Sequence, residues 1–197
     1  NYIAAWNGSS WLPMGTGMDD TVFALALYNG SLIAGGKFQH ADGQAASNIA
    51  AWNGSNWTPL GLGVSGPVYA LGTFDGRLYA GGKFSSAGAT AASNIASWDG
   101  TNWAPLGDGA DDTVLAFSVY ASRLIAGGSF NSVDGLSAHH IAAWNGRSWI
   151  RLGSGVDGTI YSLGGFNDFL IVAGEFSTAG NRQARRLVQW TKKWCCQ

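Results

Sequence analysis

Aspartates and histidines are the side chains of this sequence best suited to chemistry, and they gather in short glycine-containing stretches. One set of stretches is "GTGMDD", "GLGVSG", "GDGADD" and "GSGVDG", and the other is "QHADGQAAS", "SSAGATAAS", "NSVDGLSAHH" and "STAGNRQAR". Carboxylates could dock cationic partners or metals, and histidines act as general bases near neutral pH. The candidate ligand- or partner-binding residues are Asp19, Asp20, His40, Asp42, Asp108, Asp111, Asp112, Asp134, His139, His140 and Asp157.

Specific chemistry is harder to assign to these residues. A calcium loop needs five or six oxygens at regular spacing, as in D-x-D-x-D-G, and no such run occurs. Adjacent His139 and His140 lack the spacing of a helical zinc pair, and no G-x-S-x-G or G-x-x-x-x-G-K motif is present. We therefore expect a protein that is not an enzyme and has no cofactor and no metal. An aspartate beside glycine also caps turns, so a purely structural role remains the alternative.

The stretches recur because the whole chain is repetitive. "NIAAWNGSNW" returns as "YIAAWNGSSW", "NIASWDGTNW", "HIAAWNGRSW" and, eroded, "RLVQWTKKW". The first tryptophans, Trp6, Trp52, Trp98, Trp144 and Trp190, stand 46 residues apart, and Trp11, Trp57, Trp103, Trp149 and Trp194 are the second set. These ten are all the tryptophans of the chain, which favours a structural role for them. A period near 46 lies in the range of four-stranded propeller blades.

Each unit contains signals for two β-hairpins. "GPVYALGTF" and "RLYAGGKF" flank "DG", and "NIASW" and "TNWAPLG" flank another "DG". Such a pair between β-rich runs predicts a type I′ turn, whose central residues need positive φ. Along the first strand, Ala70 and Gly72 share one face and Leu71 lies on the other, which suits closely approaching sheets.

A strand ending in Gly-Gly, an aromatic residue before a turn and a tryptophan in the next strand resemble the kelch-type propeller repeat. The parts are "LYAGGKF", "IASWDG" and "NWAPLG", and the units also resemble repeats of secreted bacterial propellers and fungal Rax2-type cortical markers. The resemblance covers the chain and implies an all-β propeller of four 46-residue, four-stranded blades. It also implies that "PVYALGTF" is the innermost strand of its blade and that both sets of stretches emerge on one face, which should be acidic.

The outer hairpin occurs five times but the inner one only four times. We therefore predict a single domain over 1–197, with repeats at about 16–61, 62–107, 108–153 and 154–197. Residues 1–15 form a surplus outer hairpin, a partial fifth blade. Because an exposed strand edge invites pairing, we expect this hairpin to pair with a strand outside the four blades, from another copy or a longer parent chain.

Charge and sequence signals narrow the partners and the compartment. Residues 1–180 hold six basic and twelve acidic side chains, whereas residues 181–197 hold five basic and none acidic. We therefore expect no nucleic acid as a partner, and no apolar run is long enough for membrane insertion. N-x-S/T sequons at Asn7, Asn29, Asn53 and Asn56, with Cys195 and Cys196 suited to an intermolecular disulfide, favour an extracellular or cell-surface location.

These observations predict a non-catalytic extracellular module that binds a protein or glycan partner, or self-associates, through propeller loops and strand edges. The alternative is a lectin with sugar sites between blades, for which Tyr28, Tyr120 and Phe169 are the candidate aromatics. An enzyme is the distant alternative.

Overall fold

The computed structural model describes residues 2–191 and contains only β-strands and connecting loops over that range. Blade 1 comprises β3 (Val22–Tyr28), β4 (Ser31–Gly36), β7 (Ile49–Trp52) and β8 (Trp57–Pro59). Blade 2 comprises β9 (Val68–Phe74), β10 (Arg77–Gly82), β13 (Ile95–Trp98) and β14 (Trp103–Pro105). Blade 3 comprises β15 (Val114–Tyr120), β16 (Arg123–Gly128), β19 (Ile141–Trp144) and β20 (Trp149–Arg151). Blade 4 comprises β21 (Ile160–Phe166), β22 (Phe169–Gly174) and β25 (Leu187–Thr191).

The expected four blades and surplus N-terminal hairpin are confirmed. Each blade is an antiparallel meander, as in the order β9-β10-β13-β14, and β1 (Ala4–Trp6) pairs with β2 (Trp11–Pro13) as a separate two-stranded sheet. Blade 4 has three strands within the described residues. Between the second and third strand of each blade lies a two-stranded ribbon. The ribbons are β5 (His40–Ala41) with β6 (Gln44–Ala45), β11 (Ser86–Ala87) with β12 (Thr90–Ala91), β17 (Ser132–Val133) with β18 (Leu136–Ser137), and β23 (Thr178–Ala179) with β24 (Arg182–Gln183).

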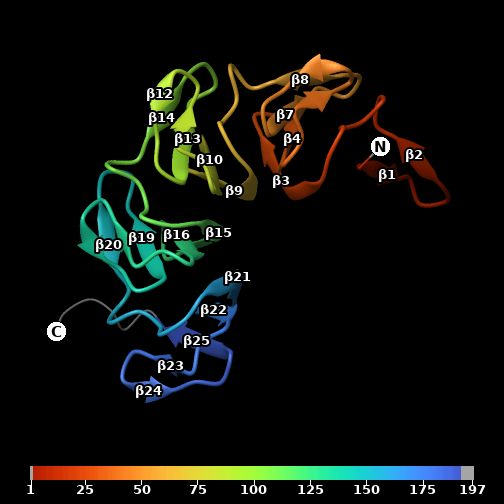
Figure 1. Cartoon of the computed structure of the whole chain (residues 1–197). Coiled ribbons are helices and arrows are strands. Elements are labelled where there is room, and N and C mark those ends of the chain that lie inside the picture. The colour runs from red at the N-terminus through yellow and green to blue at the C-terminus, as the bar shows by residue number, and fades with distance from the viewer. Residues whose placement is uncertain (1, 192–197) are drawn as a thin grey trace.

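The blades follow an open arc (Figure 1). The first strands lie on its inner side, where β3 packs beside β9, β9 beside β15, and β15 beside β21. Blades 1 and 4 form the two ends of the arc, and the N-terminal hairpin lies beyond blade 1. We call the side of a blade that faces its predecessor in the chain its leading face, and the side that faces its successor its trailing face.

The two turns of a unit differ, which corrects one expectation. The inner turn has positive φ at both central residues, 48° and 69° at Asp75 and Gly76, as type I′ requires. In the outer hairpin only Gly100 has positive φ, and Trp98 pairs with Trp103 across four residues. The Asp99 carboxylate accepts hydrogen bonds from the N–H groups of Thr101 and Asn102 at 2.8 Å, so this longer turn is closed by a side chain. The prediction of a type I′ turn at this position was wrong, although the predicted hairpin is present.

Hydrophobic cores form between neighbouring blades. Leu71 on the leading face of blade 2 packs in one cluster with Ala26, Ile33 and Ile49 of blade 1. Residues of both neighbouring sheets thus share one core. The contact is tightest at the first glycine of the Gly-Gly pair, because a Cβ built on Gly35 would lie 2.5 Å from Val68 Cγ1.

Candidate functional site

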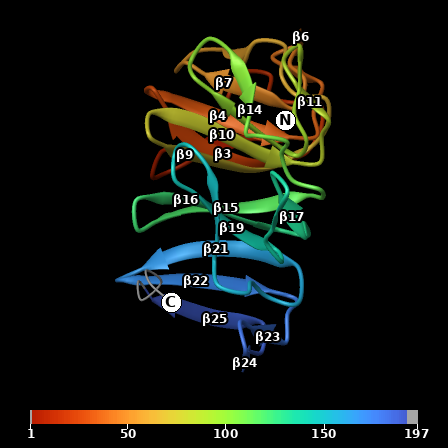
Figure 2. The same ribbon diagram turned by 90° about the vertical axis from the view of Figure 1, so that its left-hand side faces the viewer.

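The loops that carry the candidate residues emerge together on one side of the arc, as expected (Figure 2). Each inter-blade loop runs beside the ribbon of the blade that follows it. An isolated bridge joins Met18 to Ala41, and equivalent bridges occur in the other three blades. The backbone N–H of Asp42 also donates to the carbonyl of Gly17 at 2.9 Å. We call this side the loop face.

One position of the inter-blade loop holds the two loops together in every blade. Asp19 accepts hydrogen bonds from the N–H groups of Gln39 and His40 at 2.8 and 3.0 Å. Asp111 and Asp157 do the same in blades 3 and 4, with N–H groups 20 and 21 residues further along the chain. In blade 2 the hydroxyl of Ser65 replaces the carboxylate and accepts from two N–H groups at 3.0 Å. The position is therefore a structural clasp.

The clasp favours ionised carboxylates. The backbone N–H of His40, which donates to Asp19, lowers the pKa of that carboxyl to about 2, and His40 Nδ1 lies 2.7 Å from Asp19 Oδ2. The hydroxyl of Ser177 donates to Asp157 at 2.6 Å and holds its pKa well below the usual range. Asp19 and Asp157 are therefore ionised hydrogen-bond acceptors at neutral pH. Their lowered pKa is the opposite of the raised pKa expected for a general acid.

Asp42 and Asp134 link successive parts of the loop face. Asp42 accepts from the N–H of Thr16 at 2.6 Å and from the N–H of Trp57 at 2.8 Å. Burial raises the pKa of Asp42, but these hydrogen bonds outweigh it, and the net shift is downward. Asp134 accepts from the N–H of Asp108 at 2.9 Å. Blades 2 and 4 carry Gly88 and Gly180 at this position, so the link is limited to units one and three.

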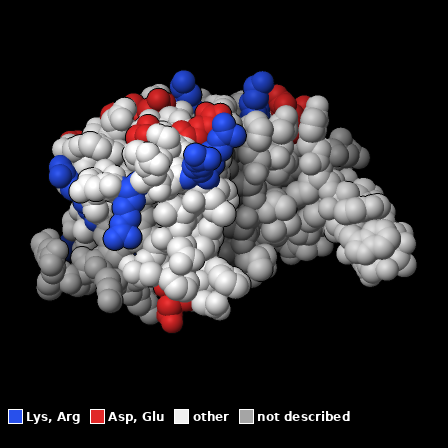
Figure 3. Space-filling view, turned by 90° about the horizontal axis from the view of Figure 1, so that it is seen from below, with Lys and Arg blue, Asp and Glu red and all other residues white. Residues whose placement is uncertain are grey.

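Asp20 and Asp112 cap their own loops and lie near cations. Each accepts from the next residue's N–H at 2.6 Å, which lowers the pKa of both carboxyls. Lys37 Nζ lies 3.8 Å from Asp20, and the charge of Lys83 acts on Asp112. In Figure 3 acidic and basic side chains are interspersed along one edge of the molecule. Lys37 and Lys83 thus lie among the carboxylates of the loop face, and the acidic character of the face as a whole stays a prediction.

The two histidines of the third unit lie where the backbone has positive φ. His139 and His140 have φ of 49° and 71°. Burial lowers the pKa of His140, and its Nδ1 makes no hydrogen bond within the described residues. Its counterpart Asn94 instead donates from its side chain to the carbonyl of Ala110 at 2.9 Å. Among the described residues, no three or more His, Cys, Asp or Glu side chains are placed to hold a metal ion.

The remaining predicted positions have mixed outcomes. The four sequon asparagines are all exposed, and two of them, Asn7 and Asn53, close hairpin turns with their side chains. Tyr28 is buried and its hydroxyl donates to the carbonyl of Gly76, while the Tyr120 hydroxyl donates to Asp168. These two aromatics are therefore parts of blade contacts. Cys195 and Cys196 lie outside the described residues.

The second tryptophan of each complete blade is buried in a slot at the edge of its sheet, although in blade 3 Trp149 Nε1 has no hydrogen-bond partner within the described residues. The indole N–H of Trp57 donates to the carbonyl of Met14 at 3.0 Å, and that of Trp103 donates to Leu60 at 2.9 Å. Gly61 and Gly88 both lie near the Trp103 ring, since a Cβ built on them would be 3.7 and 3.4 Å from Trp103 Cδ1. Sequence reasoning assigned these tryptophans to the framework but gave no sign of the glycine-lined slot.

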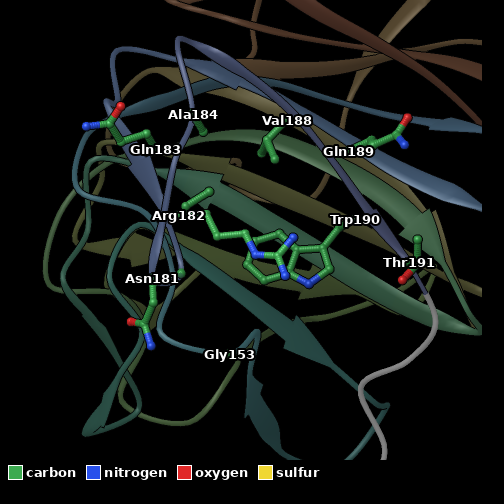
Figure 4. Close-up of a pocket in the computed structure, with 11 residues that line it drawn as sticks. Gly153, Asn181, Arg182, Gln183, Ala184, Val188, Gln189, Trp190 and Thr191 are labelled. Carbon is green, nitrogen blue, oxygen red and sulfur yellow. The ribbon is translucent and has the colours of Figure 1, made fainter.

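In blade 4 the corresponding place is a pocket of about 660 Å³ (Figure 4). Gly153 and Gly180, the counterparts of Gly61 and Gly88 of blade 2, line it together with Trp190. Polar side chains complete the wall. They are Asn181, Arg182, Gln183 and Gln189.

Large apolar side chains are exposed at both ends of the arc. The sequence predicted an unpaired hairpin at the N-terminal end but did not predict these exposed residues. Leu25, on the leading face of blade 1, is 53% exposed, whereas its counterparts Leu71 and Leu163 pack into inter-blade cores. On the N-terminal hairpin Trp11 is 70% exposed, whereas its counterpart Trp57 is 0% exposed. At the other end Leu187 is 62% exposed.

Comparison with known proteins identifies the architecture only. No protein-family model and no curated protein matches the chain. Among solved structures, the chain resembles the computationally designed Ika4 protein, with a TM-score of 0.56 and 16% identity over 90% of this chain and 94% of that one. It also resembles the designed Ika8 protein, with a TM-score of 0.50 and 14% identity over 92% and 62%.

A third similar structure is the extracellular domain of a putative hybrid two-component system from B. thetaiotaomicron. Its TM-score is 0.50, and the match has 15% identity over 77% of this chain and 19% of that one. At these identities the likeness extends to the fold alone. Within residues 2–191 there is no helix that could cross a membrane.

Proposed function

We propose that the chain is a non-catalytic binding or assembly module that receives a partner at the end of the arc formed by blade 1 and the N-terminal hairpin. The observation that carries this proposal is the exposure of Leu25 on a sheet face whose three counterparts are covered by a neighbouring blade. Burial of such a face contributes about 25 cal/mol per Å² of apolar surface. A covered state is therefore strongly favoured.

The strand edge beside this face supports the same function. In blades 1 to 3 the third strand pairs on both sides, as β7 does with β4 and β8. Strand β1 occupies the equivalent place in the N-terminal hairpin but pairs only with β2 within the described residues. An open edge of this kind binds an added strand through its backbone groups.

The loop face supports a non-catalytic role. Asp19, Asp42, Asp111 and Asp157 all accept backbone hydrogen bonds that tie loops together. Loop contacts to a partner would therefore come from the outer atoms of rigidly held side chains. Their repeat pattern supports assigning the units to the kelch-type class. The exposed sequons and the likeness to an extracellular domain support an extracellular location.

The test is a panning experiment with displayed peptides of about 20 residues, accompanied by the mass of the chain in solution. Leu25→Lys should abolish binding of the selected peptides, because the substitution puts a charge on the face that the partner covers. Val119→Lys is the matched control, since Val119 is 50% exposed on β15, in a blade that has a neighbour on both sides. Peptides that bind both variants equally would place the binding surface elsewhere and refute the proposal.

A lectin is the second candidate, and the pocket of blade 4 favours it. Its volume of about 660 Å³ is in the range of small-molecule sites, and Trp190 lies beside polar groups able to hydrogen-bond hydroxyls. Screening on a glycan array would test this candidate. Sugar binding that Arg182→Ala and Gln183→Ala both remove would support it, and an array without specific binding would exclude it for the sugars displayed.

A further inference from the structure

The ends of the arc offer two surfaces that are related to an interface the molecule already contains. The contact between the trailing face of one blade and the leading face of the next occurs three times. The part of the leading face of blade 1 that β3 forms and the trailing face of blade 4 are the parts of that contact left uncovered within residues 2–191. Each can therefore be compared, position by position, with three covered counterparts.

The covered contact requires glycine on its trailing side. A Cβ built on Gly81 would lie 2.6 Å from Val114 Cγ1, and one built on Gly127 would lie 2.6 Å from Ile160 Cγ2. Both partners are β-branched residues whose side chains have little freedom to move away. Any residue larger than glycine must push the sheets apart at this point.

The leading face of blade 1 keeps the pattern that this contact needs. Val22 stands where Val68, Val114 and Ile160 stand in the other blades, and it is only partly buried whereas each of those is at most 1% exposed. Leu25 is the exposed counterpart of Leu71. The face therefore matches a trailing face that carries glycine at the position of Gly35.

The trailing face of blade 4 departs from the pattern. Ala173 replaces the glycine, and its Cβ would meet the β-branched residue of any further blade at the same spacing. Gln189 replaces the small residues Ala51, Ser97 and Ala143 on the same face. Two bulkier side chains thus stand where the three internal contacts have the least room.

The N-terminal hairpin is the outer half of a blade that lies at the leading face. Ile3 and Ala5 of this hairpin pack against the same buried cluster as Val22, Leu32 and Trp52 of blade 1. The hairpin has the register of the other outer hairpins, with Trp6 opposite Trp11 as Trp52 is opposite Trp57. What the position lacks, within the described residues, is the inner pair of strands.

We propose that β1, β2 and the leading face of blade 1 form an acceptor for an inner β-hairpin of this same repeat with glycine at the Gly35 position, and that blade 4, through Ala173, ends the array. The inference rests on the proposed function and specifies its partner. The occupant is a hairpin from an additional unit of this repeat type. The inner hairpin of blade 4 in a second copy is excluded as occupant at the observed spacing.

An intramolecular graft tests the acceptor without knowledge of the natural partner. Residues 62–93, which hold one inter-blade loop, inner hairpin and ribbon, are placed directly before Tyr2, so that Ser93 precedes Tyr2 as it precedes Asn94. The graft should raise the melting temperature by about 5 °C or more and lower the binding of a hydrophobic dye. The control carries Gly81→Ala in the grafted copy only, and it should lose at least half of that gain. Equal gains for both grafts, or no gain for either, would overturn the inference.

If the grafted chain does not fold, the same acceptor can be tested with a separate peptide. A synthetic peptide of residues 62–93 should slow hydrogen exchange in residues 4–6 and 22–28 of the unmodified chain, and the Gly81→Ala peptide should do so at least tenfold less effectively. Equal protection by the two peptides would refute the glycine requirement. This test uses a repeat hairpin as its probe, whereas the proposed function is tested with peptides selected by panning. Failure of the hairpin peptide would therefore refute this inference without refuting the proposed function.

The terminal role of blade 4 has its own test in sedimentation velocity. In the unmodified chain, blade 4 of one copy should not associate with blade 1 of another. Ala173→Gly should make this association at least severalfold stronger, and adding Leu25→Lys should reverse the gain. If the unmodified chain self-associates, and Leu25→Lys and Leu187→Lys each abolish the association, then blade 4 accepts a further blade and the inference fails. Unchanged behaviour of Ala173→Gly would likewise remove Ala173 as the cause.

Discussion

Replacement of Trp57 by alanine should be the most costly single change among the paired tryptophans. Trp57 is fully buried, and a tryptophan buries about 150–250 Å² of surface, which corresponds to about 4–6 kcal/mol at about 25 cal/mol per Å². Relaxation of the surroundings brings the expected loss to about 3–5 kcal/mol. Loss of the indole donor also leaves the Met14 carbonyl without its 3.0 Å hydrogen bond. Trp52 is only half-buried, so Trp52→Ala should cost less.

Trp11→Ala is the matched control, because the ring pair is the same. The Trp6–Trp11 and Trp52–Trp57 centroids are both 5.4 Å apart, but Trp11 is exposed. Trp11→Ala should therefore cost about 1 kcal/mol or less. Urea unfolding followed by far-ultraviolet circular dichroism measures both losses without relying on tryptophan fluorescence. Similar losses for the two variants would refute the slot as the source of the stability.

Four further substitutions test the loops, the blade contacts and an inner turn. Asp19 has a folded-state pKa of about 2, below its ordinary value of about 4, so its contribution is present above pH 4 and is lost as the pH falls from about 4 to about 2. Asp19→Asn should therefore flatten the pH dependence of unfolding in that window, by about 1 kcal/mol or less because the carboxylate is solvent-screened. Gly127→Ala should lower stability by about 1–3 kcal/mol, while Gly164→Ala, where an added Cβ meets nothing within 4 Å, should change it by less than about 0.5 kcal/mol, both by urea unfolding. Ala121 and Ser122 form an inner turn with φ of 50° and 56° and no glycine, so Ser122→Gly should raise the melting temperature, with a gain of about 0.5–1 kcal/mol.

The architecture was predictable because its signals are local and repeated. A period of 46 residues, Asn-Gly or Asp-Gly hairpin turns and alternating small and large residues each recur in several units, so errors at one position do not accumulate. The count of five outer and four inner hairpins correctly located the surplus hairpin. The outer turn was misassigned because Asp99 closes it with its side chain over four residues, and the same Asp-Gly letters fit both turn types.

The site was less predictable because its residues act across sequence separations that differ from the repeat. Asp19 bonds to N–H groups 20 and 21 residues away, and Asp42 bonds to Thr16 and Trp57. The kelch-type resemblance implied that these aspartates lie on one face, but it could not distinguish a carboxylate that holds loops from one that awaits a ligand. The presence of Ser65 at the Asp19 position was the available signal, since a hydroxyl retains the acceptor role and loses the charge.

The open arc also determines how stability is distributed along the chain. Blades 2 and 3 are each held by two neighbours, whereas blades 1 and 4 are each held by one, and no ring closure couples the ends within residues 2–191. Stability then behaves as a sum of unit and nearest-neighbour terms, as in a linear Ising chain. Unfolding should fray inward from the terminal blades, and a pulling force applied to the two ends should detach blades one at a time, with the central pair yielding last.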